Sequence, residues 1–193
     1  MRRRESLLEA AAYFFHHEGY RVTTGDIAER AGVTKRTLYR YMGTKQTMLF
    51  EVCLAAHAWS VPEGLSTVEP IRERLTVLIT AHAEAVAGMH EAMMVWFEEA
   101  KYLSDGQRDE VRKSQAAHVQ AYQDVIAAGI DEGQFRACNR SIVARSIHGA
   151  VCNLARWYQP RGALAATALG HEIATLLIEG IGRREPSSRG MTG

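Results

Sequence analysis

The stretch AGVTKRTLYRYM, residues 31–42, joins a glycine turn to a short segment rich in bases and tyrosines. An α-helix advances by about 100° per residue, which places Leu38 and Met42 one above the other on one side. The opposite side, an arc of about 140°, carries three bases and a phenol: Lys35, Arg36, Tyr39 and Arg40. The stretch predicts a short helix that packs through its apolar side and presents positive charge outward.

The residues before this helix predict how it is held. Thr34 is placed to cap a helix over residues 35–42. Gly32 suits the turn, and the small Ala28 lets the preceding helix cross closely. Leu38 then fills the space between the two helices. This layout is typical of a helix-turn-helix, whose second helix enters the major groove of DNA.

The residue types divide the predicted DNA contacts into two groups. The first residues of the helix are expected to reach base edges: Lys35, Arg36 and Thr37. Phenols, a hydroxyl and a lysine in the next helix suit phosphate oxygens: Thr24, Tyr39, Tyr41 and Lys45. Thr34 and Arg40 complete the predicted DNA-binding set. The arginines at positions 2–4 are either a minor-groove arm or a solvated start of the chain.

The charge distribution agrees with a polyanionic partner for the N-terminal part. The chain has 193 residues and a net charge of +1. Residues 1–45 hold nine Lys/Arg against five Asp/Glu, net +4, which leaves 14 against 17, net −3, for the rest. Three scattered cysteines indicate reduced thiols, and no signal peptide or apolar run of membrane-spanning length is present. We therefore expect a cytoplasmic protein.

Apolar residues recur at helical spacing along almost the whole chain, which predicts an all-α fold. The first expected helix ends at Gly19. The following helices are expected to cover about residues 23–31, 35–42, 44–59, 68–87, 91–103, 106–132, 141–158 and 163–181. We expect residues 1–50 to form a DNA-binding head of three or four helices. Residues 51–182 are expected to form a helical bundle for ligand binding and dimerisation, and residues 183–193 a disordered tail.

Residues 5–52 resemble the DNA-binding head of the TetR family of transcriptional regulators. The resemblance rests on AAAYFFHHEGY (residues 10–20) and TTGDIAERAGVTKRTLYRYMGTK (residues 23–45). Met42 stands where the family usually has Phe, and Gln46 where it often has Glu. The resemblance implies a homodimeric repressor that a small molecule releases from a palindromic operator of double-stranded DNA.

The C-terminal part is similar to a branch of this family that responds to acyl-CoA thioesters in lipid or steroid degradation. The similar segments are AGIDEGQFR (residues 128–136) and ARWYQPRGAL (residues 155–164). The predicted ligand-binding residues combine soft, aromatic and polar side chains: Met93, Trp96, His118, Tyr122, His148, Cys152 and Trp157. Two alternatives stay open, because the methionine-rich helix suits a plain core and the polar row of His148 and Cys152 suits a surface or a dimer interface.

The last helix carries an apolar stripe that predicts the dimer contact, namely Leu169, Ile173, Leu176 and Leu177. A two-fold dimer would set two recognition helices about one DNA turn, roughly 34–36 Å, or a multiple of it apart. The alternative is a monomer that buries this stripe in its own bundle.

No catalytic motif is present, so we do not expect an enzyme. Glu98 and Glu99 are adjacent and point about 100° apart on a helix. The eight histidines include no pair at His-x3-His spacing, so we expect neither a metal nor another cofactor. The alternatives to an acyl-CoA-responsive repressor are a repressor that senses another hydrophobic or drug-like ligand, or a DNA-binding protein without a ligand.

Overall fold

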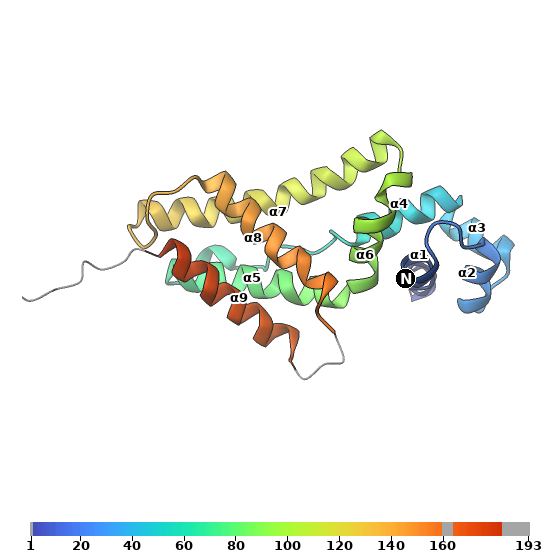
Figure 1. Cartoon of the computed structure of the whole chain (residues 1–193), viewed down its shortest axis with the longest axis horizontal. Helices are drawn as coiled ribbons and strands as arrows, with labels where there is room; N and C mark the ends of the chain where they lie inside the picture. The colour runs from blue at the N-terminus through green and yellow to red at the C-terminus, as the bar shows by residue number, and fades with distance from the viewer. Residues whose placement is uncertain (1, 160–163, 183–193) are drawn as a thin grey trace, which may run out of the picture.

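A computed structural model describes residues 2–159 and 164–182, and it confirms the predicted all-α fold in that part of the chain. The molecule is elongated (Figure 1), with a small group of helices at one end and a longer bundle at the other. We call the first group the head; its helices are α1 (Arg2–Glu18), α2 (Thr24–Arg30), α3 (Lys35–Met42) and α4 (Lys45–Ala55).

The second group, which we call the body, is formed by α5 to α9. Its helices are α5 (Ile71–Gly88), α6 (His90–Glu99), α7 (Asp105–Asp131), α8 (Arg140–Cys152) and α9 (Ala166–Ile181). Short 3-10 turns at Leu65–Thr67, Ala100–Tyr102 and Asn153–Arg156 join them. In Figure 1, α6 stands between the head and the rest of the body.

Threonine caps start three successive head helices, as the sequence predicted for Thr34. The Thr34 hydroxyl accepts the Thr37 backbone N–H at 3.2 Å, and Thr44 caps α4 in the same way. At α2, Thr23 and Asp26 form a reciprocal capping box. Each cap satisfies a backbone donor that the first helical turn leaves unpaired.

The head closes over the apolar side of α3. Leu38 and Met42 are buried, together with Ile27 and Ala28 of α2, which confirms the side of α3 that faces inward. Gly32 adopts φ +63°, a conformation that glycine takes without steric cost, so it supports the turn between α2 and α3.

Several helix ends differ from the sequence predictions. α4 ends at Ala55 instead of near residue 59, because the chain turns there and buries His57 and Trp59. α5 begins at Ile71 instead of residue 68, since Pro70 disfavours a helical conformation in the residue before it. α8 ends at Cys152 and continues only as a 3-10 turn.

Close packing of α5 against α9 fixes the last helix on the body. A Cβ atom built at Gly170 would lie 2.8 Å from the Thr80 Cα, so only glycine permits this approach. The end of α9 is also held, because the Arg136 backbone N–H donates to the Ile181 carbonyl at 3.0 Å.

Among the described residues, no helix is long and apolar enough to cross a membrane. The predicted start of the last helix at residue 163 and the predicted disordered tail, residues 183–193, lie outside the described residues. The predicted division after residue 50 falls within α4 and stays a prediction.

Candidate DNA-binding surface and ligand-binding core

The outward side of α3 forms a basic and aromatic surface. Lys35, Arg36 and Arg40 are exposed, and 47% of Tyr39 and 40% of Tyr41 are accessible to solvent. The Arg40 guanidinium lies 5.0 Å from the centre of the Tyr41 ring. This surface has the charge and donors that a DNA backbone and guanine edges require.

Thr24 and Tyr39 extend this surface from α3 to α2. Their hydroxyl oxygens are 3.0 Å apart, so each is hydrogen-bonded to the other. Thr34 and Thr37 are also bonded to each other, at 3.1 Å between their hydroxyl oxygens. Each of these four hydroxyl groups is therefore oriented by its partner.

Lys45 lies at the junction of the head and the body. Its ammonium group is 4.6 Å from the centre of the Tyr20 ring, and partial burial lowers its pKa. Arg4, one of the arginines considered for a minor-groove arm, belongs to α1 and pairs with Glu51 at 2.7 Å.

The body encloses a cluster of aromatic rings and histidines. The Trp59 indole contacts two imidazoles, 4.6 Å from the His82 ring and 4.5 Å from the His118 ring between centroids. His82 Nδ1 is 3.0 Å from the Tyr122 hydroxyl, and the Cys152 sulfur lies 3.7 Å from His82 Nε2. Side chains from α5, α7, α8 and the segment after α4 thus meet in one place.

The predicted ligand-binding residues fall into two groups. His118, Tyr122, His148 and Cys152 belong to this cluster, and Trp96 joins it through an edge-on contact with His57 at 5.4 Å between centroids. Met93 is fully buried on the same helix as Trp96. Trp157 is different, because 56% of it is exposed to solvent.

Sequence reasoning missed His57, Trp59 and His82 as members of the cluster. His82 lies on the apolar side of α5. A histidine among the apolar residues of that helix is the sequence signal that could have indicated a place in the cluster. Burial lowers the pKa of His57 to about 3 and that of His148 to about 4. These two imidazoles are therefore neutral near pH 7.

An opening of about 420 Å³ between α7 and α8 leads to this cluster. Its lining includes Arg112, Gln115, Arg145 and His148. A larger groove, about 800 Å³, lies between α1 and the α5–α6 turn and is lined by residues such as Leu8, His16 and Met89. Among the described lining residues of these two hollows, arginines occur only in the smaller one.

α6 connects the cluster to the head. The Tyr20 backbone N–H donates to the Glu99 carboxylate at 3.0 Å, and Glu99 is buried. The Tyr20 ring stacks on Tyr102 at 4.8 Å between centroids. Gln46 of α4 donates to the Tyr102 carbonyl at 3.1 Å. A shift of α6 would therefore act directly on the head.

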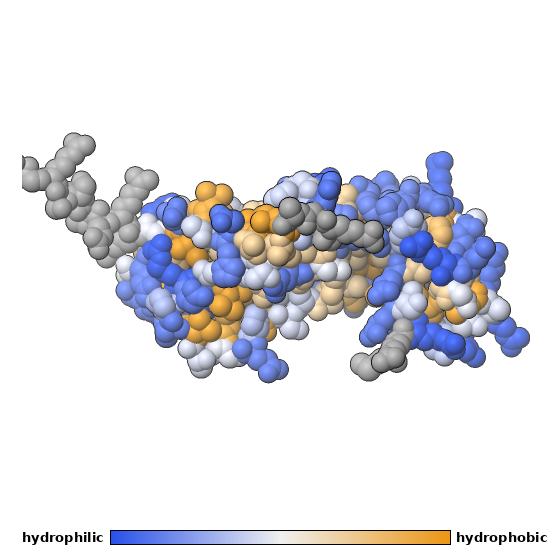
Figure 2. Space-filling view, turned by 90° about the horizontal axis from the view of Figure 1, so that it is seen from below, coloured by the Kyte–Doolittle hydropathy of each residue, from blue (hydrophilic) through white to orange (hydrophobic). Residues whose placement is uncertain are grey.

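The predicted dimer stripe on α9 divides into buried and exposed members. Leu169 is buried within the protomer, Ile173 and Leu177 are partly buried, and 71% of Leu176 is exposed. Ile142 on α8 is also 63% exposed. Figure 2 shows hydrophobic side chains on this side of the body and a mostly hydrophilic head.

The second helix of the helix-turn-helix is exposed and basic, and the head that carries it is joined to a bundle with an enclosed cluster. This combination is typical of a helix-turn-helix transcriptional regulator. Residues 7–52 match the family profile described as bacterial regulatory proteins, tetR family, and residues 68–181 match that of the tetracyclin repressor-like C-terminal domain. The chain belongs to the TetR family of bacterial transcriptional regulators. Family membership confirms the prediction of a regulator that is not an enzyme.

Relatives of known identity cover almost the whole chain. The HTH-type transcriptional repressor KstR2 of Mycolicibacterium smegmatis is 32% identical over 185 residues, which are 93% of this chain and 90% of that protein. The structure of the ketosteroid transcriptional regulator KstR2 of Mycobacterium tuberculosis is 29% identical, with a TM-score of 0.82 over 94% of this chain and 96% of that one. AibR, solved with isovaleryl coenzyme A and operator DNA, has the same fold, with 20% identity and a TM-score of 0.74 over 93% of this chain and 97% of that one.

Proposed function

We propose that the protein is a homodimeric repressor that binds a palindromic operator and is released by an acyl-CoA thioester. The observation that carries the proposal is the position of α6. Its Trp96 contacts the enclosed cluster, and its Glu99 holds the backbone of Tyr20 in the head. A ligand that moves α6 would therefore change the placement of α3.

The cluster and its opening suit the two ends of a thioester. Trp59 and Tyr122 of the cluster would supply apolar surface for an acyl group, as ligand pockets usually do. Arg112 and Arg145 border the opening, where they are placed to attract the phosphates of coenzyme A. The regulator AibR, which has the same fold and was solved with isovaleryl coenzyme A, supports this class of ligand.

A dimer would account for the exposed apolar side chains of α8 and α9. Leu176 and Ile142 are among the most exposed large apolar side chains of the described residues. A two-fold contact through this face would place one α3 at each end of the assembly, over the two halves of a palindrome. Release then requires only that the ligand bind one dimer conformation better than the other.

Thermal unfolding against a panel of compounds tests the ligand and requires no operator DNA. The panel contains short, long and ring-bearing acyl-CoA thioesters, their free acids, coenzyme A and cationic drugs. A ligand at about 100 times its Kd stabilises the protein by roughly 2.7 kcal/mol, a Tm increase of roughly 5–10 °C. A thioester that raises Tm should then reduce binding to operator DNA selected from random duplexes.

The other arms of the panel decide between alternatives. A Tm increase with drugs alone, or with free acids as much as thioesters, would replace the acyl-CoA assignment with another hydrophobic ligand. DNA binding that no raised-Tm ligand affects would contradict the release step itself.

A further inference from the structure

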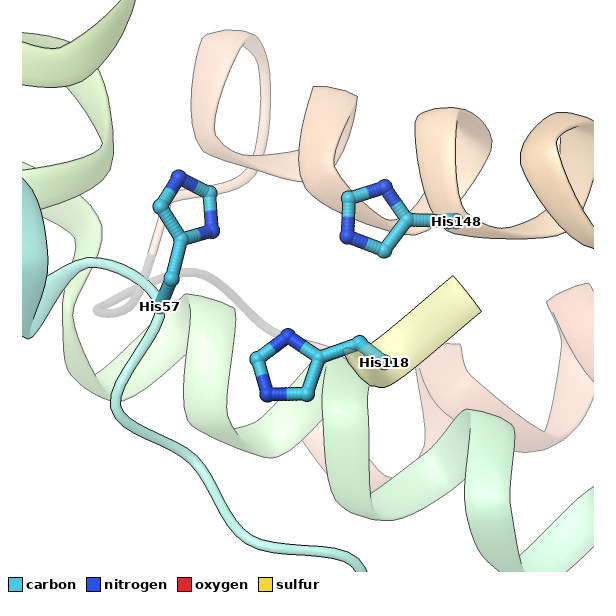
Figure 3. Close-up of side chains that lie close together, drawn as sticks. All are labelled: His57, His118 and His148. Carbon is cyan, nitrogen blue, oxygen red and sulfur yellow. The ribbon is translucent and has the colours of Figure 1, made fainter. Parts of the chain in front are cut away.

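Three histidines from distant parts of the chain converge inside the body. His57 follows α4, His118 lies on α7 and His148 on α8. Figure 3 shows one ring nitrogen of each imidazole turned toward the space between the three rings. Their ligand atoms all lie within 4.8 Å of one another. Such a convergence of imidazoles is the donor set that proteins use for transition metals.

Two of the converging nitrogens lack a hydrogen-bond partner within the described part of the chain. The Nδ1 atoms of His57 and His118 are both buried and unpaired there. Most buried polar atoms in proteins are paired, because an unpaired one loses its hydration without compensation. An ion between the rings would satisfy both atoms at once.

The outer nitrogens are already held in the way that metal-binding histidines usually are. His118 Nε2 lies 3.1 Å from the Trp59 carbonyl oxygen. A carbonyl only accepts, so this nitrogen carries the proton and His118 Nδ1 keeps its lone pair. Ligating imidazoles typically donate their other N–H to a carbonyl or a carboxylate, which fixes the ring.

His57 has a comparable partner in Gln115, whose side-chain amide nitrogen lies 3.0 Å from His57 Nε2. A glutamine amide can present its oxygen or its nitrogen to the ring after a half-turn. With the oxygen toward His57, the amide accepts the Nε2 proton and leaves Nδ1 as a free lone pair. The same side chain lines the opening to the solvent, which supplies an entry path.

We propose that His57, His118 and His148 form a binding site for a divalent transition metal of the zinc type, with a fourth coordination position open. Tetrahedral zinc with Zn–N bonds of about 2.0–2.1 Å requires donor nitrogens about 3.3 Å apart. The imidazoles must therefore close by at most about 1.5 Å around the ion.

A second group, His82 with His148 and Cys152, is a weaker candidate for the same ion. Its donors are already engaged, because His82 Nδ1 is bonded to the Tyr122 hydroxyl and His82 Nε2 faces the Cys152 sulfur.

The open position would take an anion. Three neutral imidazoles leave the full charge of the ion uncompensated, and Arg112 and Arg145 add positive charge at the opening. Hydroxide, chloride or an anionic effector would complete the site. The metal site does not depend on the identity of the effector or on DNA binding.

Metal binding is tested with the untagged full-length protein after treatment with EDTA. Zn²⁺ is titrated by competition with a chromophoric chelator, and Co²⁺ is titrated by its visible absorption. We expect one ion per protomer and the intense visible bands of tetrahedral Co²⁺. His118→Gln should weaken Zn²⁺ binding by more than 100-fold, and Gln115→Ala by about 10- to 100-fold as a loss of outer support.

His171→Gln is the matched control, because His171 is an exposed histidine on α9. It should bind Zn²⁺ like the unaltered protein. If His118→Gln fails to fold, judged by circular dichroism, His148→Gln and Gln115→Ala carry the test. Zn²⁺ binding that these substitutions leave unchanged would assign the ion to another site, and the absence of stoichiometric binding would also overturn the proposal.

Discussion

The Glu99 carboxylate accepts the backbone N–H of Tyr20 at 3.0 Å, across the junction between body and head. Glu99 ends α6, and Trp96 of the same helix meets His57 edge-on inside the body. One short helix therefore touches both the enclosed cluster and the DNA-binding part. Any change in the cluster that displaces Trp96 also displaces the partner of Tyr20.

Removal of this link should uncouple the two parts. Glu99→Ala leaves the Tyr20 N–H without its acceptor, which we expect to lower the free energy of unfolding by about 1–3 kcal/mol. A thioester should still bind, but its effect on DNA affinity should decrease. Paired titrations of DNA with and without ligand measure this coupling. Glu98→Ala, at a more exposed neighbour, should change stability by less than about 0.5 kcal/mol. Equal effects of the two substitutions would refute the role of Glu99.

Substitutions on α3 should separate base recognition from phosphate contact. Arg36→Ala should cost about 1–3 kcal/mol on the preferred operator and relax its sequence preference. Tyr41→Ala should weaken binding to all DNA sequences alike, because a phosphate contact carries no sequence information. Fluorescence anisotropy on a set of single-base operator variants distinguishes the two. An unchanged preference profile after Arg36→Ala would show that other side chains read the bases.

The exposed apolar face should mediate the dimer. Leu176→Asp places a charge on the most exposed large apolar side chain of α9, which we expect to dissociate the dimer. Light scattering after size exclusion should then give the mass of one chain, 21.4 kDa, in place of two. Thr175→Asp adds the same charge at an exposed polar neighbour and tests whether charge alone is responsible. A dimer that survives Leu176→Asp would place the contact elsewhere.

Glycine at position 170 should be essential for the packing of α5 against α9. Gly170→Ala forces its Cβ to within 2.8 Å of the Thr80 Cα, so we expect a loss of about 1–3 kcal/mol. Gly180→Ala, in the same helix but with open space around its Cβ position, should be neutral or slightly stabilising. Urea unfolding of both variants gives the comparison. Similar stability of the two would mean that the helices separate at little cost.

Stability should decrease in mild acid because of the buried histidines. Burial lowers the pKa of His57 from its usual 6.5 to about 3 and lowers that of His82 still more clearly. The unfolded chain therefore takes up these protons at a higher pH than the folded one. The contribution of the neutral His57 to the free energy of unfolding is complete above pH 6.5 and is lost as the pH falls from 6.5 toward 3.

In that window each such histidine contributes a slope of about 1.4 kcal/mol per pH unit. Urea unfolding of metal-free protein at several pH values measures the slope. His57→Gln should reduce it, whereas the exposed His171→Gln should not. A stability that stays constant as the pH falls from about 6.5 to about 5 would contradict the burial of neutral imidazoles.

Local signals predicted the head well. Thr34 and the residues 35–42 specify their own helix, because a cap and an apolar side four residues apart act over short distances. The inward side of α3 follows from the same spacing. The structure adds the hydroxyl pair of Thr24 and Tyr39, which depends on how two helices cross.

The histidine cluster could not be predicted from local spacing. His57, His118 and His148 come from three separate segments, and nothing in one helix specifies which face of another it will meet. The prediction of no metal rested on the absence of a local His-x3-His pair, a signal that cannot detect a site assembled from distant segments. The role of Trp157 in ligand binding stays a prediction, because its side chain is largely exposed in the protomer.

The placement of Lys45 over the Tyr20 ring has a consequence for the ionic-strength dependence of DNA binding. A lysine that neutralises a phosphate displaces a condensed counterion, so each such contact adds about one unit to the slope of log affinity against log salt. Tyr20 also stacks on Tyr102 in the 3-10 turn after α6, and each protomer of the proposed dimer would carry one Lys45. A ligand that shifts this stack would withdraw both lysines together. The released state would then differ from the bound state in the number of counterions displaced as well as in affinity.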